Sequence, residues 1–180
     1  MSIKKANSDE VVKVMLDQEK MEVRVPGVGE GDWVKVNPGF VGYYRVAYDA
    51  EEMERLTKAV QTKELSPVDR LQIIDDLFSL IMAGKASTVE GLRLLKAYKD
   101  EDSYIVWNAI SNSVAKLQVI VADQDYYENF KRFVLDVFSV IKTKTTWDPA
   151  SDETHFDTLL RSLVLNKLGR YLTRLYLASS

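Results

Sequence analysis

The spacing of apolar residues along the chain changes at about residue 50. Before this point, residues 11–16 are rich in Val, and residues 20–25 alternate apolar with charged residues. Both patterns are typical of half-buried strands. We expect the two segments to form a β-hairpin that turns at residues 17–19.

A second pair of strands is predicted at residues 33–36 and 42–48, because Asn37, Pro38 and Gly39 between them are typical turn residues. The chain would then open with about four strands. So small a sheet has two edges with unpaired backbone groups and one face that needs a cover. We therefore do not expect it to be a complete β domain.

After residue 50 the apolar period changes to about 3.6 residues, which indicates helices. Six helices are predicted, joined by short turns. The first is expected at 51–60, the fourth at about 103–121 and the fifth at about 125–142. The sixth carries apolar residues from Phe156 to Leu168, after a loop at 145–153.

The second and third helices have explicit start signals. Ser66 is expected to cap the second helix, with Pro67 at its first position and Asp69 in its first turn, and Gly84 is expected to end it. Ser87 and Glu90 form the two ends of a capping box that opens the third helix.

Apolar stripes along these helices predict their buried faces. The residues expected to be buried include Val68, Leu71, Ile74, Phe78, Ile81, Val89, Leu92, Leu95, Tyr98 and Trp107. Each helix pair is about 40 residues long, which matches an α-solenoid of HEAT or armadillo type. The predicted fold is mainly α, with a short β segment followed by this solenoid; a compact helical bundle is the alternative.

Composition narrows the classes of partner. The 24 basic and 27 acidic residues are scattered, so no basic stripe indicates a nucleic acid partner. No apolar stretch approaches the roughly 20 residues that span a bilayer, and no secretory signal opens the chain. The lack of cysteine excludes disulfides and fits a cytoplasmic location.

The sequence offers little catalytic chemistry. His155 is the only histidine, so a His-Glu-x-x-His zinc site cannot be built, and no Gly-x-Ser-x-Gly elbow supports a serine triad. We expect His155 to cap or pack near the start of the sixth helix. Asp75 and Asp76 diverge by about 100° around a helix and are interpreted as solvated, not as ligands of a common ion. Asp123 and Asp125 are interpreted in the same way.

A resemblance to a known family adds to this picture. The stretch WVKVNPGFVGYYRVAYD, residues 33–49, resembles the end of the small β-sandwich domain of the gluzincin aminopeptidases, where it leads into a helical C-terminal domain. The similarity continues in LSPVDRLQIIDDLFSLIMAGKAS (65–87), YIVWNAIS (104–111) and WDPASDETHFDTLLRSLVL (147–165). Within the family, the branch of the puromycin-sensitive aminopeptidases is most similar.

This resemblance implies a fragment of a longer enzyme. Residues 1–49 would be the end of the β-sandwich domain, and residues 50–180 the first part of the helical domain. The family's zinc and its catalytic motifs lie in another domain, so no catalytic or metal-binding residue is expected in this chain. Its partners would be the missing catalytic and β-sandwich domains, together with peptide substrates in the full protein.

The resemblance also implies one candidate site residue. In the family, the helical domain caps the catalytic domain and limits access of peptides, and in antigen-processing members a Tyr-Lys pair contacts the peptide's carboxyl end. The aligned positions here are Ala115 and Lys116. Lys116 is therefore a candidate substrate-binding residue, although the Tyr is missing and an ordinary exposed lysine is the simpler interpretation.

Three functional hypotheses follow. The first is a non-catalytic segment that supports and caps a zinc aminopeptidase. The alternative is a stand-alone helical-repeat module that binds a protein or peptide partner on its concave face. The third, an independent hydrolase that uses His155, has the least support. An incomplete sheet and solenoid would also expose edges, so we expect self-association through residues 11–25 or the helix after Asp152.

Overall fold

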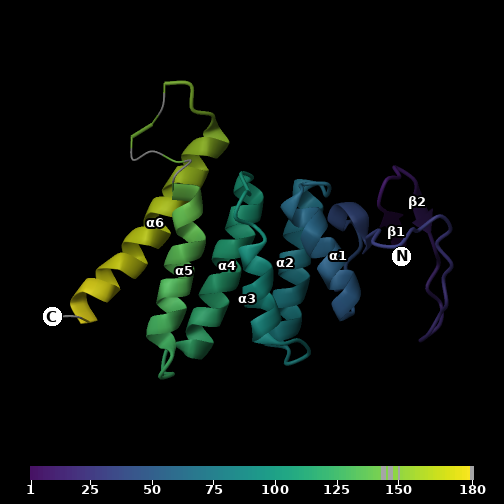
Figure 1. The fold of residues 1–180 in the computed structure, drawn as a ribbon, viewed down its shortest axis with the longest axis horizontal. Coiled ribbons are helices and arrows are strands. Elements are labelled where there is room, and N and C mark those ends of the chain that lie inside the picture. The colour runs from purple at the N-terminus through teal and green to yellow at the C-terminus, as the bar shows by residue number, and fades with distance from the viewer. Residues whose placement is uncertain (143–144, 146–147, 150, 179–180) are drawn as a thin grey trace. The chain divides into compact units, whose positions relative to one another are not determined.

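The computed structural model describes residues 1–142, 145, 148–149 and 151–178 (Figure 1). The predicted mainly helical chain with a short β segment at its start is confirmed. The elements are β1 (Ser2–Lys5), β2 (Val11–Lys13), β3 (Val34–Val36), the 3₁₀ turn η1 (Pro38–Phe40), α1 (Ala50–Gln61), α2 (Pro67–Met82), α3 (Thr88–Lys96), α4 (Tyr104–Val121), α5 (Tyr127–Lys142) and α6 (His155–Ala178).

The chain divides into two compact units, residues 1–86 and residues 87–180, called unit 1 and unit 2 below. The domain boundary predicted after Asp49 stays a prediction. So does the solenoid arrangement of the helices. In the part of the chain that the structure describes, no helix combines the length and the apolar character needed to cross a membrane.

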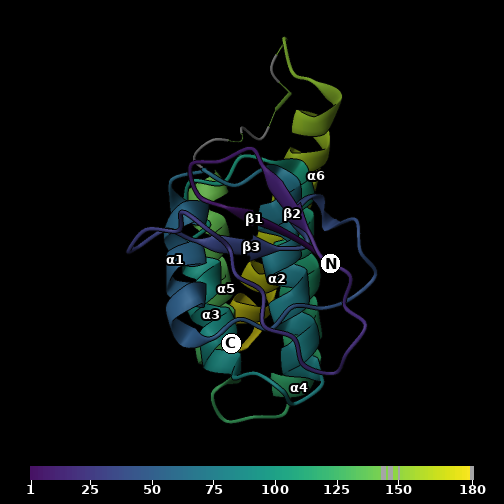
Figure 2. The ribbon, with the colours of Figure 1, turned by 90° about the vertical axis from the view of Figure 1, so that its right-hand side faces the viewer.

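Unit 1 opens with an antiparallel sheet in which β1 lies between β2 and β3 (Figure 2). Ile3 of β1 is opposite Val12 on one side and Val36 on the other. Its side chain is buried, as is that of Trp33 just before β3. The described residues thus form three strands, fewer than the predicted four.

The predicted hairpin between residues 11–16 and 20–25 is wrong. β2 pairs with β1 instead, and residues 20–25 form no strand in the described structure. Sequence reasoning missed β1 because Ile3 is its only apolar residue and lysines follow it. Asn7 adopts a left-handed φ of 55° in the turn between these strands, a conformation that Asn tolerates better than most residues.

The strand predicted at residues 42–48 is also absent from the described structure. Its backbone donors go to other groups: Tyr44 N–H donates to Gly42 O at 3.0 Å, and Val46 N–H donates to the Asp76 carboxylate at 3.3 Å. The segment therefore lies against α2 and does not extend the sheet.

The helices of unit 1 begin with side-chain caps. Asp49 accepts a hydrogen bond from Glu52 N at 2.8 Å at the start of α1. Ser66 caps α2 as predicted, and Gly84 follows the end of this helix with a φ of 69°. Glu52 also accepts a hydrogen bond from Val34 N at 2.6 Å, which ties α1 to β3.

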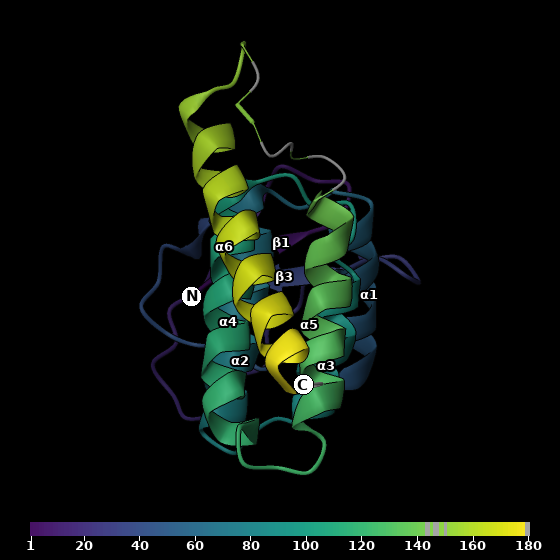
Figure 3. The same cartoon turned by 90° about the vertical axis from the view of Figure 1, so that its left-hand side faces the viewer.

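Unit 2 consists of α3 to α6, and α6 packs against both α4 and α5 (Figure 3). The predicted capping box of Ser87 and Glu90 is confirmed. Trp107 is fully buried as predicted. Its ring lies 5.2 Å from that of Phe138, and its Nε1–H donates to Glu101 O at 3.1 Å.

Two valines that were predicted to be buried are exposed: Val68 by 38% and Val89 by 54%. The buried face of α3 contains Gly91, Leu94 and Leu95. At 100° per residue, Val89 lies about 200° from Gly91 around the helix axis, on the opposite side. The apolar stripe read from the sequence was therefore too wide.

Candidate functional site

A cluster of polar side chains is buried in unit 1, where β3 and the following turn meet α2. Its members, called the polar cluster below, are Lys35, Asn37, Asp69, Gln72 and Asp76. The Lys35 ammonium donates to Val36 O at 2.9 Å and to Gln72 Oε1, and it lies 3.9 Å from Asp69 Oδ1. Gln72 Nε2 in turn donates to Asp76 Oδ2 at 3.0 Å. These bonds hold β3 against α2.

Burial perturbs the ionisation of this cluster. It lowers the pKa of Lys35 to about 8, although the negative charges of Asp69 and Asp76 oppose the change. Burial also raises the pKa of Asp76 above its ordinary value, against the hydrogen bonds from Arg45 and Gln72. Among the described residues, no buried side-chain nitrogen or oxygen lacks a hydrogen-bond partner. The cluster is a satisfied network, as buried polar groups require.

The polar cluster fixes a loop of unusual backbone geometry at residues 37–45. Asn37 and Phe40 have left-handed φ values of 58° and 55°. The Asn37 side chain donates to Gly42 O at 2.9 Å and accepts from Gly42 N at 2.7 Å. Gly39 N–H donates to Asp69 Oδ1 at 2.8 Å. Such conformations persist where the surroundings hold them firmly, and they are frequent at functional sites.

Arg45 closes the end of this loop. Its Nη1 donates to Asp75 and, at 3.1 Å, to Asp76 Oδ1, and its guanidinium lies 5.8 Å from the centre of the Phe40 ring. The interpretation of Asp76 as a solvated group is therefore wrong, whereas the side chain of Asp75 is 31% exposed. Asp76 is 2% exposed, and the two carboxylates share one cation because Arg45 reaches both from outside the helix.

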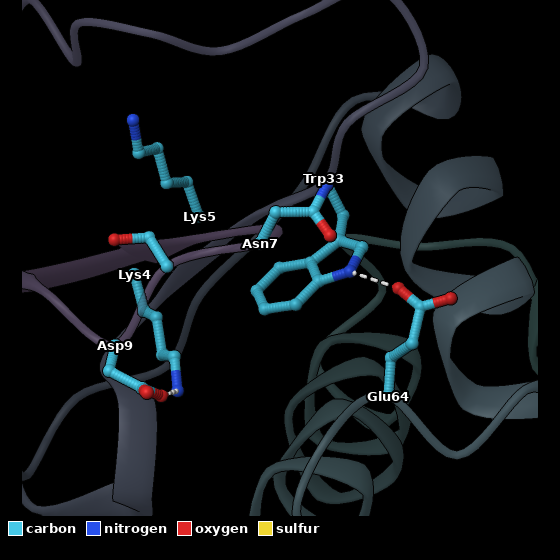
Figure 4. Close-up of a pocket in the computed structure, with 7 residues that line it drawn as sticks. Lys4, Lys5, Asn7, Asp9, Trp33 and Glu64 are labelled. Atoms are coloured by element: carbon cyan, nitrogen blue, oxygen red, sulfur yellow. Dashed lines mark hydrogen bonds and ion pairs between the residues drawn. The ribbon is translucent and has the colours of Figure 1, made fainter.

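A polar cavity of about 360 Å³ lies beside Trp33 in unit 1 (Figure 4). Its charged groups are already engaged. Trp33 Nε1–H donates to Glu64 Oε2 at 2.9 Å, Lys4 pairs with Asp9 at 3.3 Å, and Lys5 donates to backbone oxygens of residues 26 and 27. We interpret this cavity as part of the contact between the sheet and the end of α1.

Unit 2 has an apolar cavity of about 300 Å³ where α3, α4 and α5 meet. Leu117, Val121 and Phe130 are its buried lining residues, and the partly exposed Ile120 and Tyr126 lie at its edge. Its lining in the described structure contains no charged side chain. Nothing in this lining provides a group for catalysis.

The structure places the predicted site residue Lys116 on α4 with an exposed side chain, next to the half-buried Ala115. Polar bonds in the described structure join the same helix to α6. Lys167 Nζ donates to Ser111 O at 3.2 Å, and Tyr171 OH donates to Gln118 Oε1 at 2.8 Å. None of these bonds involves Lys116, whose role in binding stays a prediction.

His155 is the first residue of α6, and it is exposed. Its ring lies 6.1 Å from the ring of Phe156. The helix is capped one residue earlier, since Asp157 N–H donates to Thr154 Oγ1 at 3.3 Å and Thr154 N–H donates to Asp157 Oδ2 at 3.0 Å. In the described part of the chain, no three His, Cys, Asp or Glu side chains gather as a metal site would require.

Sequence reasoning missed the polar cluster, although a signal was present. Residues 33, 35 and 37 share one face of an extended chain, so Lys35 had to lie beside the buried Trp33. On α2, Asp69, Gln72 and Asp76 are spaced by three and four residues, which places them on one side of the helix. The sequence thus indicated which residues of each segment lie on one face, but it did not indicate that the two faces pair.

Comparison with known proteins gives a consistent picture. The family model described as "ERAP1-like C-terminal domain" matches residues 33–174. Aminopeptidase M1-A of Oryza sativa subsp. japonica is 38% identical over 142 residues, which are 78% of this chain and 16% of the relative. Aminopeptidase M1 of Arabidopsis thaliana is 38% identical over 144 residues, with the same coverage of both chains.

A more distant relative covers more of the chain. Puromycin-sensitive aminopeptidase of Caenorhabditis elegans is 28% identical over 165 residues, which are 91% of this chain and 17% of the relative. The chain thus spans about a sixth of the length of the curated relatives that it matches. The 37–45 loop and the whole of α2 lie inside the region that the family model covers.

Proposed function

Because the chain belongs to the ERAP1-like C-terminal domain family, we propose that it is a non-catalytic part of a zinc aminopeptidase that supports and caps the catalytic part. One observation carries this proposal: the family match covers residues 33–174, while the matched relatives are aminopeptidases about six times as long as the match. The enzyme as a whole would remove amino-terminal residues from peptides.

The residues of this chain fit such a supporting role. With one histidine and no cysteine, the chain lacks the usual nitrogen and sulfur ligands for a catalytic zinc ion. The zinc would be held by the catalytic part of the full enzyme, which would be the partner of this chain together with the rest of the β-sandwich domain. The absence of cysteine supports a cytoplasmic location.

An activity assay tests the proposal directly. The purified chain, supplied with zinc, should not release the fluorophore from an aminoacyl fluorogenic substrate above background, and metal analysis should find no stoichiometric zinc. The full-length enzyme is the positive control. Turnover by the isolated chain that disappears in a His155→Ala variant would contradict the proposal and support the hydrolase hypothesis.

Lys116 is proposed to contact the carboxyl end of peptide substrates in the full enzyme. Its exposed position on α4 supports this role. A Lys116→Ala variant of the full-length enzyme should have a raised KM for peptides with a free carboxyl end. Its KM for the same peptides with an amidated carboxyl end should be unchanged. Lys99→Ala, which removes another exposed lysine of unit 2, is the control. An equal effect on both kinds of peptide would argue against the contact.

The alternative function, a stand-alone module, predicts specific peptide binding by the isolated chain. Calorimetry with peptides that the full enzyme cleaves separates the two proposals, because a supporting segment should bind them at millimolar strength or not at all. Micromolar peptide binding by a monomeric chain would favour the module.

Sedimentation over a range of concentrations tests the proposed self-association through residues 11–25 or the helix after Asp152.

A further inference from the structure

We propose that an apolar face of unit 1 binds the catalytic part of the same aminopeptidase, and this inference rests on the proposed function. The face, called the loop face below, is formed by Met15, Val41, Tyr43 and Tyr44. Three of its side chains are among the most exposed apolar groups of the described chain: Met15 by 80%, Val41 by 87% and Tyr43 completely.

Such exposure in one place is unusual for a surface that faces water. Single exposed apolar residues are common, but contiguous apolar patches mark interaction sites. Here Met15, Val41 and Tyr44 line a cavity of about 390 Å³ together with Val14, and Tyr43 is the neighbour of Tyr44 in the chain. A cavity with this lining would accept an apolar side chain of a partner.

The loop that carries Val41 and Tyr43 is held in a fixed conformation. Asn37 bonds both backbone groups of Gly42, and Asp69 binds Gly39 N. Asn37 and Phe40 keep left-handed backbone angles, a strain that persists only where the surrounding structure holds it. A loop that is already ordered loses little conformational entropy on binding, which favours affinity. Tyrosine is also enriched among the residues that dominate binding energies.

The length of the relatives indicates which partner covers this face. Five sixths of each aminopeptidase lies outside the matched region, and the loop lies inside the family match. The cavity lining contains one lysine, Lys13, and no acidic residue. This composition fits the apolar centre of a protein interface better than a charged ligand. The part of the enzyme that this chain supports is therefore the assigned occupant.

Oxidative footprinting tests the assignment. Hydroxyl radicals should label Met15 and Tyr43 strongly in the isolated chain, at concentrations where sedimentation shows a monomer, and several-fold less in the full-length enzyme. Tyr126 of unit 2, which is 53% exposed, is the reference for general labelling. Equal labelling of Tyr43 in an active full-length enzyme would overturn the inference but leave the proposed function intact. Protection of Tyr43 in the isolated chain, with a dimer in sedimentation, would assign the face to a second copy and also overturn it.

Variants give a second, independent measurement. The double variant Val41→Ser, Tyr43→Ser should lower the temperature at which the full-length enzyme loses activity, but leave the melting point of the isolated chain unchanged. Val119→Ser replaces a valine of unit 2 that is 80% exposed and should change neither value. An Asn37→Gly variant, which keeps the left-handed angle accessible but removes the side-chain bonds, should also lower the inactivation temperature. An unchanged inactivation temperature in the double variant would contradict the docking role.

Discussion

In unit 1, the segment from β3 to Tyr48 is fixed to α2 by hydrogen bonds and ion pairs, whereas in unit 2, α4 and α5 pack through apolar side chains around Trp107. The first contact is directional: each bond of the polar cluster requires one partner at one angle. The stabilisation from the second contact is roughly proportional to the apolar area that it buries. Unit 1 can therefore hold a loop in a strained conformation, which apolar packing alone would not specify.

The largest effect should come from a substitution in the apolar core of unit 2. Trp107→Ala removes a fully buried side chain and should lower the free energy of unfolding by about 3–5 kcal/mol. Denaturant titration measures this change. The exposed Val119→Ala should cost less than about 0.5 kcal/mol. A Trp107→Ala variant as stable as the native chain would mean that α4 is not packed as described.

The pH dependence of stability tests the polar cluster of unit 1 through the ionisation of Lys35. The folded chain releases this proton at about pH 8, while the unfolded chain keeps it up to about pH 10.5. Stability should therefore rise with pH between these values, by up to about 3 kcal/mol. Denaturant titrations at several pH values should show this rise in the native chain relative to a Lys35→Met variant. Parallel pH curves for the two proteins would show that Lys35 is not buried as a charged group.

Removing one carboxylate of the polar cluster should have a smaller effect. Asp76→Ala removes the acceptor of three hydrogen bonds, from Gln72 Nε2, Arg45 Nη1 and Val46 N–H, and it should cost about 2 kcal/mol. The control is Asp75→Ala, since Asp75 binds the same arginine from a more exposed position. Its loss should cost less than about 1 kcal/mol. Equal costs in thermal unfolding would indicate that burial of Asp76 does not matter.

The smallest effect compares two helix caps of the same residue type. Ser87→Ala should cost about 1 kcal/mol, because it removes one acceptor at the start of α3. Ser66→Ala should cost about 2 kcal/mol, since Ser66 Oγ also donates to Asp69 Oδ2 at 2.7 Å. Paired melting curves measure the difference. A larger cost at Ser87 would reverse the ranking and contradict a link between cap and cluster.

The contrast between the units also explains which features were predictable. Trp107 and the capping box at Ser87 depend on local spacing and on residue type, so the sequence was sufficient to place them. β1 was missed because its pairing is between segments with few apolar residues. Lys35 and Asp76 are polar and resemble surface residues in one dimension. Local spacing indicated the face on which each lies, but their burial depends on the pairing of segments 30 or more residues apart, which no local pattern reveals. Lys116 lies on an exposed helix face, and its contact with a substrate stays a prediction.

Asp69 joins two structures that the chain builds separately. One carboxylate oxygen accepts from Gly39 N–H, and the other accepts from Ser66 Oγ at the start of α2. Fraying of the first helical turn would thus release the loop at the same moment. Amide protons of Gly39 and Asp69 should then exchange with deuterium through one shared opening event, so that the loop and this turn behave as a single cooperative element.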